Sequence, residues 1–368
     1  MRLHIVKKET ALLAVIASFS MMLCTCSDES PEYNLSNNHS MTFATSVQEW
    51  GVSAKQMEYE NSTGSDTARS IARQQIIPIE KEDNIGLVAI RGNKVNYNRT
   101  LSIDSNPITR GQLKDEVSTS DKFCLAAYYD ENGTERTFID KQLVKWDHKD
   151  ETTNTNFWKL DNDDETVYWK LGSQAITTYA WWPTNLSFNS TTKRFSYTIG
   201  EDPVNQSDFL YSYVKPTYYT VKESADITFK HALTAVQFVM GTGFGNSDGQ
   251  NPAHVTKIEL QNLYYTGEFD PKTEEWLIDK SKTRTFTLDI DSPVDMHNEE
   301  KNVVLNPDKY TLLMMPQDLG ETPCLAIFYL DDGRTFRATL NHGGVWRPGE
   351  TVRFLLLGDI SVGYVIYA

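Results

Sequence analysis

Seven histidines are the residues best suited to acid–base or metal chemistry, and none stands at metal-ligand spacing from a cysteine or a second histidine. The chain also lacks a GxSxG elbow, an HExxH pair, a P-loop and, beyond its first 26 residues, a CxxC pair. His231 shares strand parity with Phe229 and Leu233, so we expect it to point into a core. The sequence therefore predicts no catalytic residue, no metal site, no cofactor and no enzyme.

Two further groups of side chains could bind a ligand. Residues 161–165 (DNDDE) share the acidity of a calcium loop but lack the glycine that the EF-hand turn needs, so we expect a solvated loop. A sugar-stacking platform would use Trp158, Trp169, Trp181 and Trp182. Adjacent strand residues point to opposite faces, so at most one of Trp181 and Trp182 can join it. Core packing is the favoured interpretation, because aromatic residues dominate the cores of β-sandwiches.

The start of the chain has the features of a targeting segment. A positively charged beginning precedes an apolar run over residues 11–23, which is too short for a normal membrane span. The run ends in Leu-Cys-Thr-Cys, which resembles a bacterial lipobox, whose acylated cysteine becomes the first mature residue. Cys26 is the preferred lipidation site and Cys24 the alternative. A secretory leader that is cut without lipidation is the competing interpretation.

Charge and composition narrow the class of protein further. The formal net charge is −15, with no basic run, which is unfavourable for binding nucleic acid or an anionic bilayer. Aromatic residues make up 11% of the chain, which favours β structure over helix. Apolar residues flank both Cys124 and Cys324, so we expect two buried free thiols rather than a disulfide framework.

Alternation of apolar and polar residues defines the expected strands. Residues 26–40 are polar and turn-rich, as expected of a tether, and residues 93–119 are predicted to be an insertion or surface loop. A first strand is marked by Met41, Phe43, Thr45 and Val47. A last amphipathic strand is marked by Ile360, Val362, Tyr364 and Ile366. The many short strands between them are typical of β-sandwiches.

A stretch over residues 207–240 joins two β-rich halves. Its apolar residues fall on odd numbers up to Ala235 and on even numbers from Val236, and this one-residue slip predicts a bulge or a bend. The stretch reads SDFLYS, a spacer, then ITFKHALTAVQFVM, and it is similar to the fimbrillin family of Gram-negative type V pili. The same resemblance extends to YAWWP, LLMMPQ and WRPGETVRFLL, which follow in the order that the family has.

The resemblance implies an all-β fold of two β-sandwich domains in tandem, transthyretin-like with Greek-key connections. The expected parts are a leader over residues 1–25, a tether over 26–40, an N-terminal domain over 41–216 and a C-terminal domain over 217–368.

The resemblance also implies a function, that of a fimbrial (pilus) subunit delivered to the cell outer membrane as a surface lipoprotein and mediating adhesion. A protease would cut after Arg69 or Arg73 and release the first strand, Met41 to Val47. Residues 360–368 of a neighbouring copy would then fill the exposed groove. The implied partners are other fimbrial subunits, in a homo- or hetero-polymer, and the outer membrane before processing. The alternative is a lipid-anchored surface protein that binds glycans or proteins and never polymerises.

Overall fold

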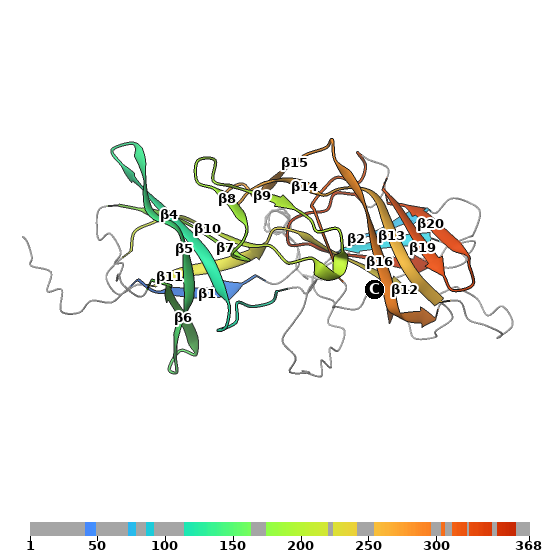
Figure 1. Cartoon of the computed structure of the whole chain (residues 1–368), viewed down its shortest axis with the longest axis horizontal. Coiled ribbons are helices and arrows are strands. Elements are labelled where there is room, and N and C mark those ends of the chain that lie inside the picture. Colours follow the sequence, from blue (N-terminus) through green and yellow to red (C-terminus); the bar gives the residue numbers. More distant parts are fainter. Residues whose placement is uncertain are drawn as a thin grey trace, which may run out of the picture. The chain divides into compact units, whose positions relative to one another are not determined.

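The computed structural model describes residues 41–48, 73–78, 86–91, 114–162, 174–219, 224–240, 254–295, 303–305, 311–321, 324–340 and 344–357 (Figure 1). The predicted leader, tether, Arg69 and donor strand lie outside these ranges. Within the ranges every element is a β-strand except one turn of 3-10 helix at Pro203–Asn205, and the predicted all-β class is confirmed. No helix among the described residues is long and apolar enough to cross a membrane.

Seven strands form a barrel whose hydrogen-bonded ladder closes on itself. In ladder order they are β1 (Phe43–Val47), β11 (Ala225–His231), β10 (Leu210–Thr217), β7 (Ile176–Trp182), β4 (Lys122–Glu131), β5 (Thr134–Asp150) and β6 (Thr155–Leu160). The barrel core contains Phe123, Trp158 and Phe229, all fully buried. Burying one such side chain stabilises the fold by about 1.5–3 kcal/mol.

A two-residue turn links β4 to β5. Asn132 and Gly133 have φ angles of 55° and 79°, the left-handed values that a type I′ turn requires. The Gly133 N–H also donates a hydrogen bond to Asp130 Oδ1 at 2.7 Å. The Asn-Gly pair therefore sets the point at which the chain reverses, and with it the register of the two strands, in which Glu131 lies opposite Thr134.

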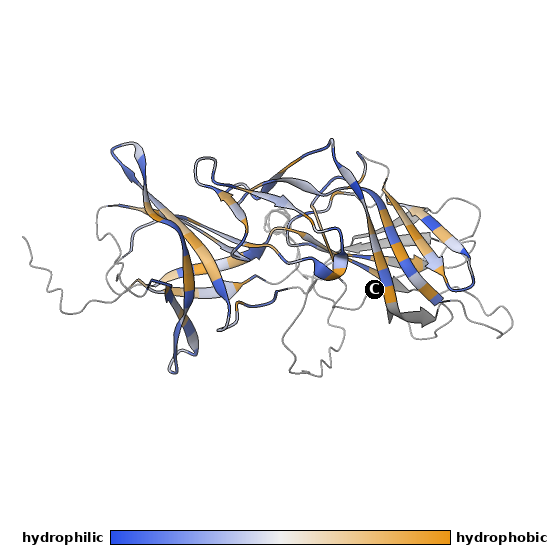
Figure 2. Ribbon diagram, in the orientation of Figure 1, coloured by the Kyte–Doolittle hydropathy of each residue, from blue (hydrophilic) through white to orange (hydrophobic). Residues whose placement is uncertain are grey.

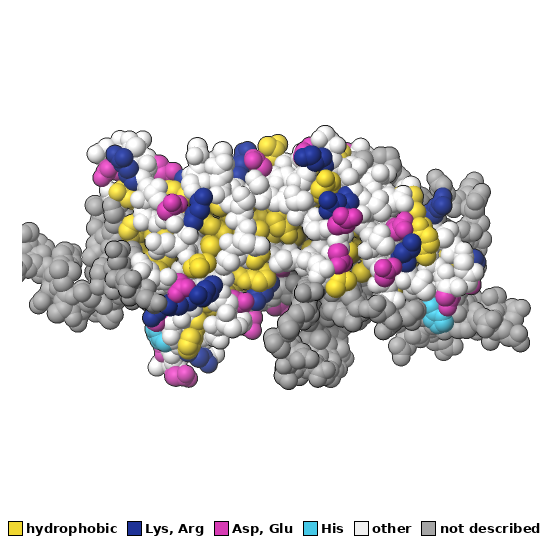
Figure 3. Space-filling view, in the orientation of Figure 1, with side chains coloured by type: hydrophobic (Ala, Val, Ile, Leu, Met, Phe, Trp, Pro, Cys, Tyr) yellow, Lys and Arg dark blue, Asp and Glu magenta, His cyan; other side chains and the backbone are white. Residues whose placement is uncertain are grey.

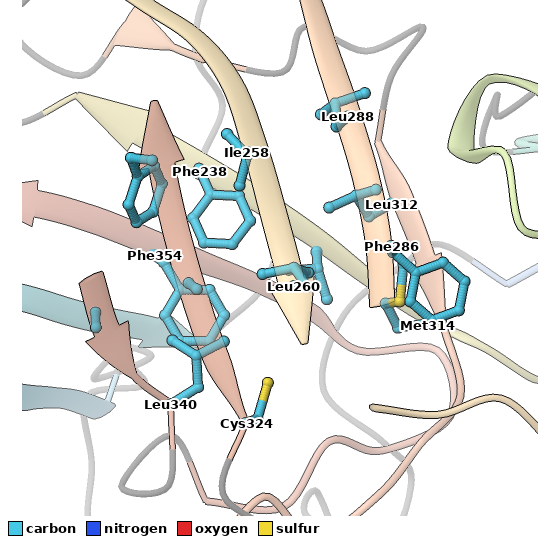
Figure 4. Packing of buried hydrophobic residues seen from close by; sticks show 14 of the residues in the cluster. Phe238, Ile258, Leu260, Phe286, Leu288, Leu312, Met314, Cys324, Leu340 and Phe354 are labelled. Carbon is cyan, nitrogen blue, oxygen red and sulfur yellow. The ribbon is translucent and has the colours of Figure 1, made fainter. Parts of the chain in front are cut away.

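Two further sheets enclose a second apolar core (Figure 4). The first has the order β17 (Val303–Val304), β12 (Thr234–Met240), β21 (Thr351–Leu357), β3 (Gly86–Arg91) and β2 (Arg73–Pro78), and β18 (Leu312–Met314) also pairs with β12. The second has the order β16 (Thr283–Asp295), β13 (His254–Tyr264), β19 (Leu325–Leu330) and β20 (Thr335–Thr339). Phe238 bridges them, since its ring lies 5.3 Å from Phe328 and 5.4 Å from Phe354.

Along β13 and β16 hydrophobic and hydrophilic residues alternate (Figure 2). This pattern is expected of antiparallel strands that bury one face and expose the other. Ile258 and Leu260 of β13 are buried in the core, whereas Lys257 and Glu259 lie on the other face and form an ion pair at 2.9 Å.

A fourth sheet combines strands from both sides of the predicted domain boundary. Its order is β15 (Glu275–Ile278), β14 (Thr266–Asp270), β9 (Arg194–Thr198) and β8 (Ser187–Asn189). Beneath it Phe209 lies 5.6 Å from Phe269 and 6.1 Å from Trp276, and the Trp276 indole N–H donates to the Ala232 carbonyl at 2.9 Å. Strands before and after residue 216 thus share one aromatic core.

The chain leaves the barrel at Ala232 and Leu233, between β11 and β12. Phe229 packs in the barrel core, Ala235 in the aromatic core under the fourth sheet, and Phe238 in the core of the last two sheets. The chain thus bends at Leu233, where it changes sheet. The predicted slip between Ala235 and Val236 lies inside β12, which pairs with β21 in unbroken register, so the bulge or bend predicted there is wrong. The slip reflects the burial of both faces of β12. The boundary predicted between residues 216 and 217 falls inside β10, just before its last residue Thr217, and both β10 and β11 lie in the barrel.

We predict that Gly267 is required for the pairing of β14 with β15. A Cβ atom at this position would lie 2.7 Å from the Leu277 carbonyl oxygen and 3.1 Å from the Ile278 Cα, so the two strands would have to separate. Gly267→Ala should lower the free energy of unfolding in urea by about 1–3 kcal/mol. Gly200→Ala is the control, because nothing lies within 4 Å of its Cβ position. Equal losses in the two variants would contradict this explanation.

Candidate functional site

β1, the predicted displaced strand, lies between β11 and β6. It runs parallel to β11, with Phe43 opposite Ala225, and antiparallel to β6, with Phe43 opposite Trp158. Just beyond the strand, the Gln48 N–H donates to the Phe229 carbonyl at 2.7 Å. β1 therefore pairs the backbone of two strands at once, and it is the element that closes the barrel.

The side chains of β1 alternate as the sequence predicts. Met41, just before the strand, and Phe43 are 2% and 0% exposed and belong to the barrel core. Val47 is half-buried and packs against the same core, and Thr45 is also half-buried. The strand is thus a short amphipathic segment whose apolar side chains complete the barrel interior.

The outer face of β1 meets a small set of aromatic and hydroxyl side chains. Ala44 lies opposite Phe157 of β6, and the Phe157 ring stacks on His148 with centroids 5.3 Å apart. The Ser46 hydroxyl donates to Thr228 Oγ1 at 3.3 Å. These outer contacts are few, so most of what holds β1 is backbone pairing and the apolar interior.

The other predicted site residues lie elsewhere. Arg73 is the first residue of β2, where it pairs with Arg91 of β3, and β3 pairs in turn with β21. Among the described strands, β2 lies at the edge of its sheet and pairs only with β3. The structure therefore separates β1, in the barrel, from β2, in another sheet, and only residues 48–72 of the chain connect them.

The two motifs at the centre of the sequence resemblance meet at a buried carboxylate–imidazole contact. Asp208 of SDFLYS and His231 of FKHAL have side chains 0% and 1% exposed, and Asp208 Oδ2 lies 2.9 Å from His231 Nδ1. The Lys114 N–H donates to the same carboxylate at 2.9 Å, and the Phe209 N–H donates to its other oxygen at 2.8 Å. The inward orientation predicted for His231 is confirmed. Its acidic partner was missed, although an aspartate at the start of an apolar strand is a usable signal.

A short segment over residues 114–121 is held against this pair. The Lys114 ammonium lies 2.6 Å from Asp121 and 4.8 Å from the centroid of the Trp182 ring. Burial alone would raise the pKa of Asp121, but hydrogen bonds from Lys114 and Ser118 outweigh it and lower that pKa. Residues 114–119 of this segment belong to the range predicted as an insertion or surface loop. The contacts of the segment hold the start of β4 close to Asp208 and His231.

The acidic run predicted as a solvated loop begins at a paired carboxylate. Lys122 and Lys145 lie 2.6 Å and 2.7 Å from the two oxygens of Asp161. Their hydrogen bonds lower the pKa of Asp161. Residues 163–165 lie outside the described ranges, and no group of three metal-ligating side chains is found among the residues inside them. On the face drawn in Figure 3 positive and negative side chains are interspersed.

The described tryptophans of the candidate sugar platform and the two described cysteines pack against the apolar cores. Trp158 and Trp181 are 0% and 2% exposed, and Trp182, half-buried, packs against the barrel core on the opposite side of β7 from Trp181. Core packing is confirmed for these residues, and Trp169 lies outside the described ranges. Cys124 and Cys324 are buried free thiols, and burial raises their pKa to about 11 and about 12.

Comparison with known proteins identifies relatives of the chain. The model of a family described as fimbrillin-like matches residues 109–356. A candidate cell adhesion protein from Bacteroides ovatus is 14% identical, with 86% of this chain and 91% of that chain covered and a TM-score of 0.49. A fimbrial protein from Bacteroides vulgatus is 12% identical, with 64% and 92% covered and a TM-score of 0.46. No curated protein sequence matches the chain.

We predict that Asp208 is essential to the stability of the contact between the start of β10 and the end of β11. Asp208→Ala would leave the N–H groups of Lys114 and Phe209 without their acceptor and remove the carboxylate beside His231. The free energy of unfolding in urea should fall by about 3 kcal/mol or more.

The control for this variant is Asp331→Ala, which breaks a second His–Asp pair at 2.7 Å, whose side chains are 32% and 43% exposed. Because solvent screens that pair, its loss should change the free energy of unfolding by at most about 1 kcal/mol. A loss at Asp208 as small as that at Asp331 would refute the structural role assigned to the buried pair.

Proposed function

The chain belongs to the fimbrillin-like family, and from this premise we propose that it is a structural subunit of a cell-surface fimbria that assembles by protease-triggered strand exchange. A fimbrial or adhesin-like role follows from family membership. The finer steps, in which a strand is released, a groove opens and a neighbouring copy fills it, are the proposal.

The position of β1 is the observation that carries this function. Loss of β1 would unpair the facing edges of β11 and β6 and uncover the barrel interior around Trp158. Unpaired strand edges beside an exposed apolar core form a template for another strand. Each large side chain buried again would contribute about 1.5–3 kcal/mol, so a strand of matching pattern has a strong driving force to enter.

The chain between β1 and β2 is where a single cut separates the displaced strand from everything that follows. A cut after Arg69 leaves β2 complete, whereas a cut after Arg73 removes the first residue of β2 from its pairing with Arg91. Arg69 is therefore the better of the two candidate sites. After either cut β1 stays bound only by its contacts with β11, β6 and the core.

Delivery to the cell surface fits the same scheme. With a lipid on Cys26, or on Cys24 as the alternative, the precursor is held at the outer membrane through the tether and β1. Exchange of β1 for the strand Ile360 to Ala368 of another subunit then transfers the protein from its membrane anchor to the fibre. The partners are other fimbrial subunits.

A lipid-anchored binding protein that never polymerises is the competing function. Its sugar platform would need exposed tryptophan faces, yet Trp158 and Trp181 are buried. No contact of the described residues favours this function over strand exchange.

We predict that the double substitution Arg69→Ala and Arg73→Ala blocks maturation. An Arg-specific protease should convert the unlipidated precursor to a product beginning at residue 70 or 74, followed by a ladder of oligomers on denaturing gels. The double variant should remain full-length and monomeric, although its fold is unchanged. Normal processing and assembly of this variant would exclude both arginines as the functional cleavage site.

We also predict that removing residues 360–368 abolishes assembly and leaves the fold intact, because β21 ends at Leu357 with its pairing complete. Cleaved protein without this segment should stay monomeric by electron microscopy and show an unaltered unfolding midpoint. Fibres formed by the truncated protein would show that the donor strand lies elsewhere.

A further inference from the structure

Trp158 is fully buried beside β1, and its indole N–H has no acceptor among the described residues. Its ring lies 5.6 Å from Phe123, and its backbone lies opposite Phe43. Side chains directly opposite each other in an antiparallel pair are in contact range. Phe43 carries no polar side-chain atom, so β1 offers the Trp158 indole N–H no side-chain acceptor at this position.

The candidate donor segment contains one residue that supplies both an aromatic ring and a hydrogen-bond acceptor. Ile360, Val362, Tyr364 and Ile366 form its apolar alternating set, in which Tyr364 is the aromatic residue. Tyrosine has the shape of phenylalanine with an added hydroxyl that accepts as well as donates. At the place of Phe43 it would fill the same space and bring an oxygen toward Trp158.

Resting on the strand-exchange function above, we propose that residues 362–368 of a second copy replace residues 41–47 with Tyr364 in the place of Phe43. The Tyr364 hydroxyl then accepts a hydrogen bond from the Trp158 indole N–H. The copy that carries Trp158 thus selects both the apolar side chains and the register of the strand that it receives.

Alternative registers fit the groove less well. The opposite strand phase would turn Ser361 and Gly363 toward the core together with Val365 and Tyr367, and it would expose Ile360, Val362 and Ile366. A shift by two residues in the same phase would place Val362 or Ile366 opposite Trp158, which leaves the indole N–H without an acceptor.

The flanking positions change the apolar surface that the barrel buries. Ile366 takes the place of Thr45, which is half-buried and opposite Ile227. On the outer face Val365 takes the place of Ala44, opposite the half-buried Phe157. Both changes add apolar surface where the barrel can bury it. Val362 in the place of Met41 and Ala368 in the place of Val47 remove some, so apolar area alone does not decide between the two strands.

Peptide exchange tests the hydrogen bond. The full chain, cut after Arg69 or Arg73, is incubated with a synthetic peptide of residues 358–368 or with the Tyr364→Phe variant of that peptide. Displacement of the fragment that contains β1 is followed by native mass spectrometry. The variant removes one oxygen atom and should bind about five-fold more weakly. On Trp158→Phe protein the two peptides should bind equally, because the donor is gone. Equal binding to unaltered protein would overturn the proposed register.

Cross-linking between copies tests the register independently. Val365→Cys combined with Phe157→Cys should give disulfide-linked oligomers after cleavage, because the two positions would be directly opposite. Gly363→Cys with Phe157→Cys is the control and should not cross-link. The reverse result would overturn the register while leaving strand exchange in place. If neither peptide displaces β1, the strand-exchange function itself fails, and this inference fails with it.

Discussion

The barrel depends on a single short strand that pairs with two neighbours in opposite senses. β1 supplies backbone partners to β11 and to β6, and its inward side chains complete an interior that contains Trp158 and Phe229. A buried backbone group without a partner is costly, and so is an exposed apolar core. Both costs would arise at the gap between β11 and β6, which we call the seam. Some strand must therefore fill the seam, but the fold does not require that this strand be β1.

The second constraint is the joint at which the chain passes from one core to the next. Asp208 and His231 hold the end of β11 against the start of β10, and Lys114 brings the entry of β4 to the same carboxylate. Directly after this point β12 buries both of its faces, one in the aromatic core and one in the core around Phe238. The fourth sheet then joins strands from before and after the joint. These contacts join the barrel to the sheets that follow it.

Local pattern was enough to predict some of these features and not others. The alternation of apolar and polar residues predicted the position of β1 and the inward orientation of His231. The opposite directions of adjacent strand residues predicted that Trp181 and Trp182 lie on opposite sides of β7. Each of these depends on residues within one strand. The parallel pairing of β1 with β11 joins residues about 180 positions apart, as in Phe43 with Ala225, and no local signal encodes it. The same holds for β2 and β3, which come between the barrel strands β1 and β4 in sequence and yet lie in the sheet of β12 and β21.

The parallel pairing also gives the seam a direction. A strand that takes the place of β1 in the same sense runs with β11 and against β6. A subunit that receives a strand at this seam and supplies one from beyond β21 uses two different surfaces. Contacts of this kind are heterologous, and they build an open filament when the rotation from one copy to the next does not close a ring. They repeat head to tail, so a fibre built from them is polar, with one end that still offers an open groove and another that still offers a free strand.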